Sequence, residues 1–448
     1  MNKKTFHIIS LGCAKNSVDS DSMAQLLVDA GYESVDDISQ AGILIVNTCG
    51  FISTAKEESY NMLADLAANK KSDQVLIAAG CLTQRYGTEV SKRVPGVDAI
   101  LGTRRWMDIV GVVDRLRVTH LGTRDLPGAA PVARNERGVQ RVSIQGASAY
   151  LKIADGCRRR CAFCAIPLIK GTAVSRPGDS ILAEARSLQA KGVHEIVLIA
   201  QDTTDYGYDL GLKNGLAYLL NKLTDAAPEV DWIRIMYAYP GYVTDELIEV
   251  IANNKRLVHY LDMPLQHSHP AVLRRMRRPT NIGWVHKTVG KMRKAIPDLA
   301  LRTTFIVGYP GETEDEFHDL LDFVEEMRFD KVGAFKYSFE PGTAAEPLGD
   351  PVPDDVKAGR LKRLMEKQQR ISLERNREII GRKMDILIEG SGQGVSIGRS
   401  YRDAPEIDGL VLVNGKIPVG QMIPVRITEA SIYDLSGVHV SQKIGHNS

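Results

Sequence analysis

Short apolar runs alternate with helix-like stretches over about the first 125 residues of the chain. Val18–Ala30 and Thr54–Ala68 have the pattern of helices. Strands that are apolar throughout are typical of a parallel sheet covered by helices on both faces. We therefore predict a parallel α/β domain over residues 1–125. The three strand-like runs are FHIISL (Phe6–Leu11), GILIVN (Gly42–Asn47) and VLIAA (Val75–Ala79).

A second series of strand–helix units follows over residues 143–375, after a Gly- and Pro-containing stretch, Leu121–Arg141, that we interpret as a linker. Six such units predict a partial or closed parallel (β/α) barrel, similar to a TIM barrel, with its chemistry at the C-terminal ends of the strands. The pattern alone does not distinguish a barrel from an open sheet. The six expected strands are Tyr150–Ile153, Glu195–Ala200, Trp232–Tyr237, His259–Met263, Leu301–Val307 and Gly333–Tyr337.

The pattern changes again in residues 383–448. The runs DILIEG, GLVLVNG and MIPVRITEA are separated by Gly and Asp turns, and no helical stretch lies between them. Several short strands with turn signals predict a small all-β barrel. The expected fold class is therefore α/β with an all-β C-terminal domain.

Composition narrows the possible functions. The 448 residues are 44% hydrophobic and 25% charged, as in an ordinary globular protein. Lys and Arg number 57 against 55 Asp and Glu, so the net charge is only +2. Without a strong positive field, binding to nucleic acid would need a local basic patch. Six cysteines are too few for a disulfide scaffold of this length and fit better as ligands or nucleophiles.

The N-terminus gives no sign of export. MNKKTFHIISLGC has only a short apolar run before Lys15, too short for a secretory signal. We find no run of about 18 apolar residues, so we expect no membrane span. We expect a cytoplasmic, reducing location, where thiols stay available for metal.

Three cysteines lie close together in the segment GCRRRCAFCAIP. Cys157, Cys161 and Cys164 follow the strand-like AYLKIAD with the spacing C-x3-C-x2-C. Three thiolates in one strand-end loop can ligate three irons of a [4Fe–4S] cluster, which leaves one iron open for a substrate or cofactor. The alternatives are a three-thiolate zinc site with a distant fourth ligand, or buried cysteines without a metal.

The other three cysteines are far apart in sequence but occupy equivalent positions. Cys13, Cys49 and Cys81 each directly follow an expected strand, in HIISLGC, ILIVNTC and LIAAGC. The C-terminal ends of parallel strands share one edge of the sheet, where ligand sites form in α/β folds. We therefore expect these thiols to converge. The alternative is three unrelated core cysteines, since free cysteine is often buried.

The segment GCRRRCAFCAIP resembles the radical S-adenosylmethionine (SAM) superfamily. Together with LGCAKN, NTCGF and AGCLTQRY, the sequence is similar to the radical SAM methylthiotransferase family over essentially the whole chain. The resemblance implies an N-terminal methylthiotransferase domain, a radical SAM partial barrel and a C-terminal TRAM domain. Ala14 departs from a usual proline, Arg158–Arg160 from a more mixed trio and Lys170 from a frequent arginine. Cluster ligation should survive these departures, and the arginine triplet should raise the potential of the neighbouring cluster.

Within the family, the sequence resembles the branch that methylthiolates an aspartate of small-subunit ribosomal protein S-twelve. The segments that resemble it include SLGCAKNSVDSD, AQDTTDYGYDL, YLDMPLQHSHPAVLRRMRRP, GYPGETEDEF, YSFEPGTAA and GRSYRDAPEIDG. The family's tRNA-adenosine branch normally has a more basic C-terminal domain without an acidic DAPEIDG segment. Because the C-terminal module here is neutral and its acids cluster in that segment, we expect it to dock a basic protein, and we consider tRNA an unlikely substrate.

The resemblance implies two [4Fe–4S] clusters and two uses of SAM. Cys157, Cys161 and Cys164 would hold the cluster that binds SAM and generates a 5′-deoxyadenosyl radical, which takes a hydrogen from the β-carbon of the target aspartate. Cys13, Cys49 and Cys81 would hold the cluster that carries the sulfur to be methylated and delivered. An electron donor such as flavodoxin or ferredoxin is implied as a partner, and the ribosomal protein is expected within the ribosomal subunit.

Polar residues at other strand ends are further candidates for the SAM site. Gln201 and Asp202 follow the strand EIVLIA, and Gln266 and His267 follow YLDMPL. Gly308, Gly311 and Glu312 in GYPGET would let the backbone approach the cofactor. Each has an ordinary structural alternative, such as a helix cap or a structural histidine.

Two other functions remain open from the sequence. One is methylthiolation of a tRNA adenosine, the same chemistry on another substrate. The other is a non-catalytic iron–sulfur or zinc module, which would need complete ligation by the protein. Each cysteine set has three thiols and no obvious fourth ligand, which favours the enzyme.

Overall fold

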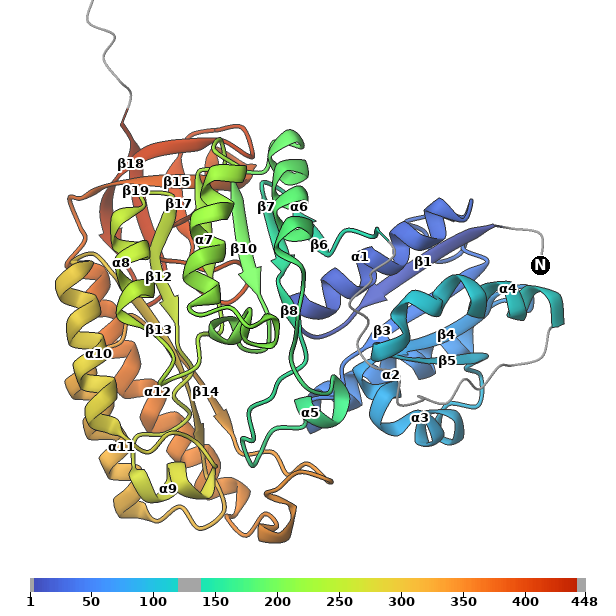
Figure 1. Ribbon diagram of the computed structural model, residues 1–448, viewed down its shortest axis with the longest axis horizontal. Helices are drawn as coiled ribbons and strands as arrows, with labels where there is room; N and C mark the ends of the chain where they lie inside the picture. The colour runs from blue at the N-terminus through green and yellow to red at the C-terminus, as the bar shows by residue number, and fades with distance from the viewer. Residues whose placement is uncertain (1–3, 120–137, 441–448) are drawn as a thin grey trace, which may run out of the picture.

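The computed structural model describes residues 4–119 and 138–440. Three large sheets follow one another along the chain, and Figure 1 shows them as a blue N-terminal domain, a green-to-orange central domain and a red C-terminal barrel. The expected fold class is confirmed. No helix among the described residues is long and apolar enough to cross a membrane.

The N-terminal domain is a five-stranded parallel sheet with strand order β2-β1-β3-β4-β5. All six residues of its central strand β3 are buried, because helices cover both faces. The strands are β1 Thr5–Ser10, β2 Glu33–Ser34, β3 Ile43–Thr48, β4 Val75–Gly80 and β5 Ala99–Gly102. The helices are α1 Ala14–Asp29, α2 Ser53–Asn69, α3 Cys81–Arg93 and α4 Ile109–Thr119.

The central domain is an open sheet of seven strands with the order β14-β13-β12-β11-β10-β7-β6. Its six parallel strands match the six predicted ones, and antiparallel β6 forms one edge. The strands are β6 Val142–Gln145, β7 Ser148–Lys152, β10 Glu195–Ile199, β11 Trp232–Ile235, β12 Leu257–Asp262, β13 Ala300–Val307 and β14 Lys331–Lys336. A separate pair is formed by β8 Ala154–Asp155 and β9 Val174–Ser175.

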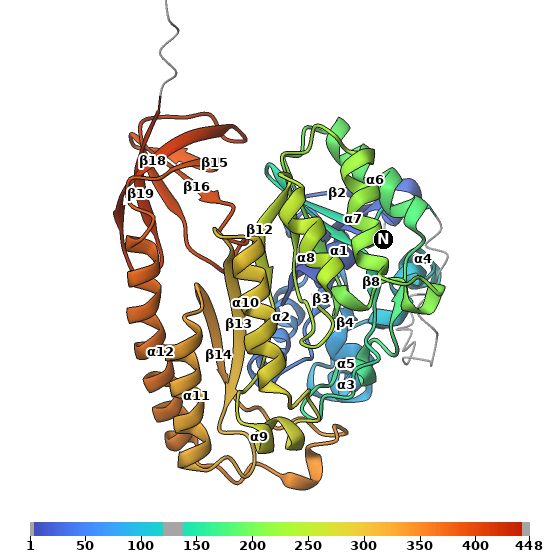
Figure 2. The ribbon, with the colours of Figure 1, turned by 60° about the vertical axis from the view of Figure 1, so that its left-hand side comes forward.

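Helices of the central domain cover the outer face of this sheet. The long helix α12 runs beside α11 and leads into the C-terminal barrel (Figure 2). The helices are α5 Ile166–Ile169, α6 Gly178–Ala190, α7 Gly215–Ala226, α8 Asp245–Asn253, α9 Pro270–Arg275, α10 Ile282–Ala295, α11 Glu314–Met327 and α12 Asp354–Arg377. Because its two edge strands, β14 and β6, do not pair with each other, the sheet is a partial barrel and not a closed one.

The C-terminal domain is a closed barrel with strand order β15-β16-β17-β19-β18. Its interior is filled by apolar side chains that alternate along the strands, as in Val411 and Val413. The strands are β15 Lys383–Gly392, β16 Val395–Ser400, β17 Val411–Asn414, β18 Met422–Ala430 and β19 Leu435–His439.

Two of the three acids of the DAPEIDG segment, Asp403 and Asp408, pack against the central sheet, so the expectation that the acids form a docking surface is wrong for these two, whereas Glu406 is exposed. The Asp403 carboxylate lies 2.8 Å from the Lys331 ammonium, and both side chains are buried. The Asp408 carboxylate accepts a hydrogen bond of 2.7 Å from the Tyr260 hydroxyl. The buried acids therefore join two domains and are not available to a basic partner.

Most of the predicted linker Leu121–Arg141 lies outside the described residues, which resume at Gly138. At its end, Arg141 is buried and pairs with Asp19 of α1, and β6 begins at Val142. The last residue of the predicted linker is therefore packed against the N-terminal domain.

Candidate active site

The first set of cysteines lies at one edge of the N-terminal sheet, as predicted. Cys13 precedes α1, Cys49 directly follows β3, and Cys81 is the first residue of α3 after β4. Because β1, β3 and β4 are neighbours in the sheet, the three loops are adjacent. Cys13 is exposed, Cys49 is partly buried and Cys81 is buried.

Glycines allow these loops to approach closely. Gly12 has a φ of +94°, and a Cβ there would lie 2.9 Å from Cys49 Cβ and 3.0 Å from its Sγ. Gly80 has a φ of +104°, and a Cβ there would lie 2.4 Å from Asn47 Oδ1. Both positions require glycine, because other residues would face both a left-handed backbone and a collision.

Asn16 connects all three loops and was missed by the sequence analysis. Its side-chain amide donates to the carbonyls of Leu11, at 2.8 Å, and Thr48, at 3.1 Å. Its Oδ1 lies 3.5 Å from Cys81 Sγ, which donates to it. The motif LGCAKN contains this residue, but only the folded chain shows that its side chain is buried among the thiols.

The second set of cysteines occupies the loop that follows β8. Gly156 has a φ of +75°, and a Cβ there would lie 2.1 Å from the Thr172 carbonyl oxygen, so the loop requires glycine. The next residue, Cys157, donates its backbone N–H to the Gly171 carbonyl at 3.0 Å. The loop is thereby fixed at the end of the strand that positions it.

Cys161 is contacted by two residues from other loops. The Tyr239 hydroxyl lies 3.8 Å from its Sγ, and Arg278 donates to the same sulfur at 3.5 Å. The backbone N–H of Ala162 also donates to the Met276 carbonyl at 2.8 Å. The cysteine loop is therefore held against the segment RRMRRP, which the sequence analysis quoted without assigning a role to it.

Burial keeps most of the thiols protonated in the absence of a metal. It raises the pKa of Cys49 and of Cys157 to about 11, and that of Cys81 and of Cys164 to about 12. Neighbouring cysteines add to the rise within each set. Iron binding replaces the thiol proton, so such sites couple metal uptake to proton release.

The donor sets fit clusters better than single ions. Within residues 4–119 and 138–440, no three Cys, His, Asp or Glu side chains are gathered closely enough to hold one metal ion. Ligands of a single zinc meet at one point, whereas cluster thiolates bind separate irons at different corners of a cube. Each set offers three thiols, the ligand type that iron–sulfur clusters use, so the donors present fit a cluster.

The arginines of the cysteine loop are largely neutralised. Arg158 forms a bidentate pair with Asp205, and Arg159 Nε lies 2.7 Å from Asp202 Oδ2. Arg160 is exposed and forms no ion pair with another described residue. The triplet therefore adds less positive charge at the cluster than its sequence implies.

Gln201 and Asp202 lie at the C-terminal end of β10, as predicted. The Oε1 atom of Gln201 is buried and accepts no hydrogen bond from any described residue. Burial raises the pKa of Asp202, although its pair with Arg159 acts in the opposite direction. An unsatisfied acceptor beside the cysteine loop fits a ligand that donates hydrogen bonds.

Gln266 and His267 lie beyond β12, on the same side of the sheet. Gln266 has a φ of +76° and its backbone bridges to β13. His267 is fully buried, and burial lowers its pKa to about 3, so the ring is neutral. Its Nε2 is buried without a hydrogen-bond partner among the described residues, since Glu312 is 3.8 Å away. This is a second unsatisfied polar atom at the strand ends.

Glu312 and the glycines of GYPGET form a compact loop after β13. The Glu312 carboxylate accepts from the backbone N–H of Gly308 at 2.9 Å and lies 2.9 Å from Arg360. A Cβ at Gly308 would lie 2.4 Å from the Lys357 side chain, so this close approach is to α12. Gly311, with a φ of +76°, completes the turn. The predicted contacts of Gly308 and Glu312 with a cofactor remain predictions.

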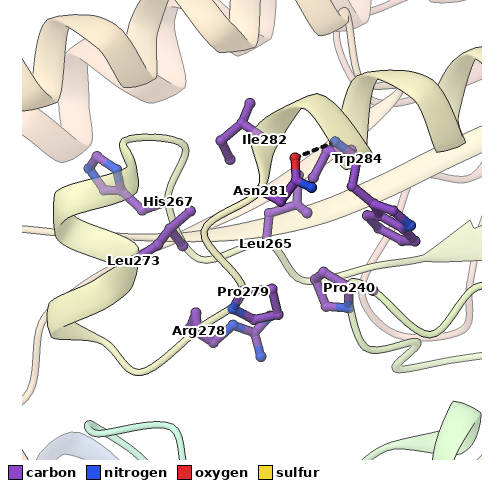
Figure 3. A pocket seen from close by; sticks show the side chains of 11 residues that line it. Pro240, Leu265, His267, Leu273, Arg278, Pro279, Asn281, Ile282 and Trp284 are labelled. Carbon is purple, nitrogen blue, oxygen red and sulfur yellow. Dashed lines mark hydrogen bonds between the residues drawn. The ribbon is translucent and has the colours of Figure 1, made fainter.

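A cavity of about 210 Å³ lies beside the second cysteine set, between the ends of β11 and β12 and the start of α10. Figure 3 shows His267 and Arg278 among its lining side chains, and the hydrogen bond of 3.0 Å from the Trp284 backbone to Asn281. The other lining residues are mostly apolar. Since Arg278 also contacts Cys161, the cavity adjoins the cysteine loop.

A buried charge network joins the two cysteine sets. The Asp19 carboxylate on α1 accepts from Lys152 at 2.7 Å, from Lys170 at 2.6 Å and from Arg141. Lys152 also lies 2.9 Å from Asp155, which directly precedes Gly156 and Cys157. Although burial opposes it, the charges of the lysines and Arg141 hold the pKa of Asp19 well below its usual value. The network fixes the N-terminal domain against the strand that positions the second cysteine loop.

Lys15 lies near this network, between the two domains. Its ammonium lies 3.1 Å from the centroid of the Tyr237 ring. Burial lowers the pKa of Lys15, while the charges of Cys13, Asp262 and Asp155 raise it in part. Nothing in the sequence marks Lys15 as part of a site, because its neighbours come from distant strands.

Three family models match the chain. They are the uncharacterized protein family UPF0004 over residues 5–102, the radical SAM superfamily over residues 151–324 and the TRAM domain over residues 380–440. The fold and the cysteine loop therefore define a radical SAM enzyme with a second cysteine-bearing domain.

Curated relatives match over nearly their full length. The ribosomal protein uS12 methylthiotransferase RimO of Chloroflexus aurantiacus is 48% identical over 97% of this chain and 100% of the relative. The RimO protein of Thermoanaerobacter sp. is 44% identical over 97% of this chain and 99% of the relative. The chain belongs to this RimO family.

Solved structures share the fold at low sequence identity. The radical SAM methyltransferase TsrM from Kitasatospora setae, with cobalamin and a [4Fe–4S] cluster bound, aligns with a TM-score of 0.57 and 13% identity over 77% of each chain. The cobalamin-dependent radical SAM enzyme OxsB aligns with a TM-score of 0.55 and 13% identity over 82% of this chain and 56% of that chain. The radical SAM architecture is thus found in experimental structures.

Proposed function

We propose that this protein is a radical SAM enzyme that adds a methylthio group to the β-carbon of an aspartate in ribosomal protein uS12. The observation that carries the proposal is the near-full-length similarity to uS12 methylthiotransferases, at 48% identity. Two sets of three cysteines at the strand ends of two domains supply the donors that such chemistry requires.

Two cofactor sites follow from the two cysteine sets. Cys157, Cys161 and Cys164 would hold a [4Fe–4S] cluster whose open iron binds SAM, and Cys13, Cys49 and Cys81 would hold a second cluster. When bound, SAM and the cluster on Cys157, Cys161 and Cys164 would supply the radical chemistry that activates a C–H bond. The cluster on Cys13, Cys49 and Cys81 would supply the sulfur.

The residues of the chain position these groups and keep water away. Gly156 shapes the cysteine loop, and Tyr239 and Arg278 hold Cys161 in place. The unsatisfied atoms of Gln201 and His267 would hydrogen-bond SAM, with Asp202, Gln266, Gly308 and Glu312 shaping the surrounding loops. The neutral ring of His267 suits this role, since it can donate from Nε2 without adding charge.

The partners follow from the reaction. The substrate is uS12, within the small ribosomal subunit, which places the reaction in the cytoplasm. A low-potential protein such as flavodoxin or ferredoxin would supply the electron. Arg160, in the loop of Cys157, Cys161 and Cys164, is exposed and would be available to such a donor.

Methylthiolation of a tRNA adenosine is the alternative function, and an experiment on the substrate must exclude it. The acidic segment does not separate the two substrates, because two of its three acids, Asp403 and Asp408, are buried between domains. The anaerobically reconstituted enzyme, with SAM, sulfide and a reductant, is incubated separately with uS12, intact small subunits and bulk tRNA. We expect methylthio addition to an aspartate of uS12, and modification of tRNA alone would overturn the proposal.

A further inference from the structure

A segment that follows β14, residues 338–345, contacts both the N-terminal domain and the loop of the second cysteine set. We call it the linking segment. At its end, the backbone N–H of Ala345 donates to the Ala162 carbonyl at 2.8 Å, and Ala162 lies inside the second cysteine loop. Near its start, the Glu340 carboxylate lies 2.8 Å from Arg85 of α3. The segment therefore connects the N-terminal domain to the second cysteine loop.

Arg85 extends this connection to the loop of the first cysteine set. Its Nη1 donates to the Gly50 carbonyl at 3.2 Å and to the Glu340 carboxylate, and its Nη2 donates to the Pro341 carbonyl at 2.7 Å. Gly50 directly follows Cys49. The side chains of Arg85 and Glu340 are 5% and 2% exposed. A single buried guanidinium thus joins the backbone beside Cys49 to the linking segment.

Helix α2 reinforces the contact with the linking segment. The Lys56 ammonium lies 3.1 Å from the same Glu340 carboxylate, and the Ser53 backbone N–H donates to Ser338 Oγ at 3.4 Å. Two cations therefore share one carboxylate that is shielded from water, where charge-assisted hydrogen bonds are strong. The linking segment is thereby fixed against the N-terminal domain.

Elsewhere, the two cysteine sets are connected by direct packing. Cys81 packs against Ala165 and Ile169, and Ala165 directly follows Cys164. Arg104 of the N-terminal domain donates to the Ile169 carbonyl at 2.8 Å. The two cysteine loops are therefore held together both by packing around α5 and through Arg85 and the linking segment.

We propose that Arg85 is a positioning residue that fixes the separation of the two cluster sites. This inference rests on the proposed function, in which carbon is activated at one site and sulfur is supplied from the other. Such a transfer requires the reacting groups to be held in a defined geometry. The planar fork of an arginine can bind the Gly50 carbonyl, the Glu340 carboxylate and the Pro341 carbonyl together, whereas the compact ammonium of a lysine lacks this fork.

The test separates SAM cleavage from sulfur transfer. Reconstituted wild type, Arg85→Met and Arg85→Lys are incubated with uS12, SAM, sulfide and a reductant, and both 5′-deoxyadenosine and methylthiolated uS12 are quantified. We expect Arg85→Met to form 5′-deoxyadenosine at the wild-type rate. Its yield of methylthiolated uS12 per 5′-deoxyadenosine should fall about 100-fold, the loss expected from a misplacement of about 1 Å. Arg85→Lys should give an intermediate yield.

A second measurement needs no substrate. Electron paramagnetic resonance reports the magnetic interaction between the two reduced clusters, which depends on their separation. We expect a broader range of separations in Arg85→Met than in the wild type, at equal iron content.

Arg93→Met is the matched control, because Arg93 lies on the same helix, pairs with Glu57 and stacks on the Tyr60 ring, all within one domain. Its replacement changes the net charge equally and should leave both measurements at wild-type values. The inference is overturned if Arg85→Met keeps the wild-type yield or the wild-type magnetic interaction, if it loses iron, or if Arg93→Met has the same effect. Failure of the wild type to modify uS12 would instead overturn the proposed function, and the magnetic interaction would still decide whether Arg85 fixes the separation.

Discussion

At the scale of single residues, the sequence reveals the cysteines but not the polar residues that support them. Cys13, Cys49 and Cys81 could be found because each follows an apolar strand, and parallel strands end at a common edge. Cys157, Cys161 and Cys164 could be found from their close spacing in one loop. Asn16 and Asp19 look like the solvent-facing side of a helix, yet each is 1% exposed. Their partners lie on other loops and, for Asp19, in another domain, so only the folded chain shows their role.

The Asp19 network predicts unequal effects of two neutralising substitutions. Asp19→Asn leaves three buried cations facing one carboxylate, and should lower the free energy of unfolding by about 3 to 5 kcal/mol. Lys170→Met leaves Asp19 with Lys152 and Arg141, and should cost about 1 to 2 kcal/mol. Denaturant unfolding of the two variants at equal iron content measures the difference. Equal losses, or a larger loss for Lys170→Met, would contradict the account of the network.

We expect the substitution Gly156→Ala to abolish binding of one cluster, the one on Cys157, Cys161 and Cys164. Gly156→Ala places a methyl group 2.1 Å from the Thr172 carbonyl at a φ of +75°, so the second cysteine loop must shift. We expect iron per chain to fall by about four, the content of one cluster. Gly146→Ala is the control, because Gly146 has a φ of +60° but no atom within 4 Å of its Cβ position. Full iron in Gly156→Ala would show that the loop tolerates the change.

At the scale of elements, apolar runs predicted the buried strands well and the boundaries of polar elements poorly. All six central strands were found, because each is apolar over most of its length. α1 begins at Ala14 and not at Val18, since its first turn is polar and contains the buried Asn16. β6 was missed because it pairs at an edge and follows a stretch without periodicity. The acidic segment was misread because the carboxylates of Asp403 and Asp408 are paired with residues of another domain.

At the start of β10, ion pairs between the central sheet and the C-terminal barrel should make the stability of the protein depend on pH. Glu195 is fully buried and lies 2.7 Å from Arg234 and 2.5 Å from Arg399. Burial opposes ionisation, but the two arginines prevail and lower the pKa of Glu195 from 4.5 to about 2. The ionised form therefore adds stability above pH 4.5, and this contribution fades as the pH falls toward 2. The shift corresponds to about 3 kcal/mol.

The substitution Glu195→Gln tests the contribution of these ion pairs to stability. The variant should unfold at lower urea concentration than the wild type at pH 7, and the gap should narrow as the pH falls below 4.5. Glu229→Gln, at an exposed glutamate without an ion pair among the described residues, should match the wild type throughout. A gap that is constant from pH 7 to pH 3 would mean that the carboxylate charge contributes nothing.

At the scale of the whole molecule, the N-terminal and C-terminal domains pack on opposite ends of the central sheet. The N-terminal domain meets the C-terminal strand ends, where the second cysteine loop lies, and the barrel packs on the opposite end (Figure 1). The domain order could be predicted from the sequence, because each sheet has its own hydrophobic pattern. Their mutual placement could not, since it depends on buried charge pairs between distant segments.

Two independent cysteine sets predict two separable clusters. The reconstituted wild type should hold about eight irons per chain. Replacing Cys13, Cys49 and Cys81 by alanine should leave about four, and so should replacing Cys157, Cys161 and Cys164. Iron and sulfide analysis with zinc determination measures this, and zinc or only four irons in the wild type would contradict the two-cluster account.

The most direct test of the account follows a labelled methyl group into uS12. The wild type and the two triple-alanine variants are incubated with uS12, sulfide, a reductant and SAM with a deuterated methyl group, and the protein is fragmented for mass spectrometry. We predict one sulfur and one labelled methyl group on a single aspartate with the wild type, and none with either variant. Unmodified uS12 with the fully loaded wild type, or labelled product from either variant, would contradict it.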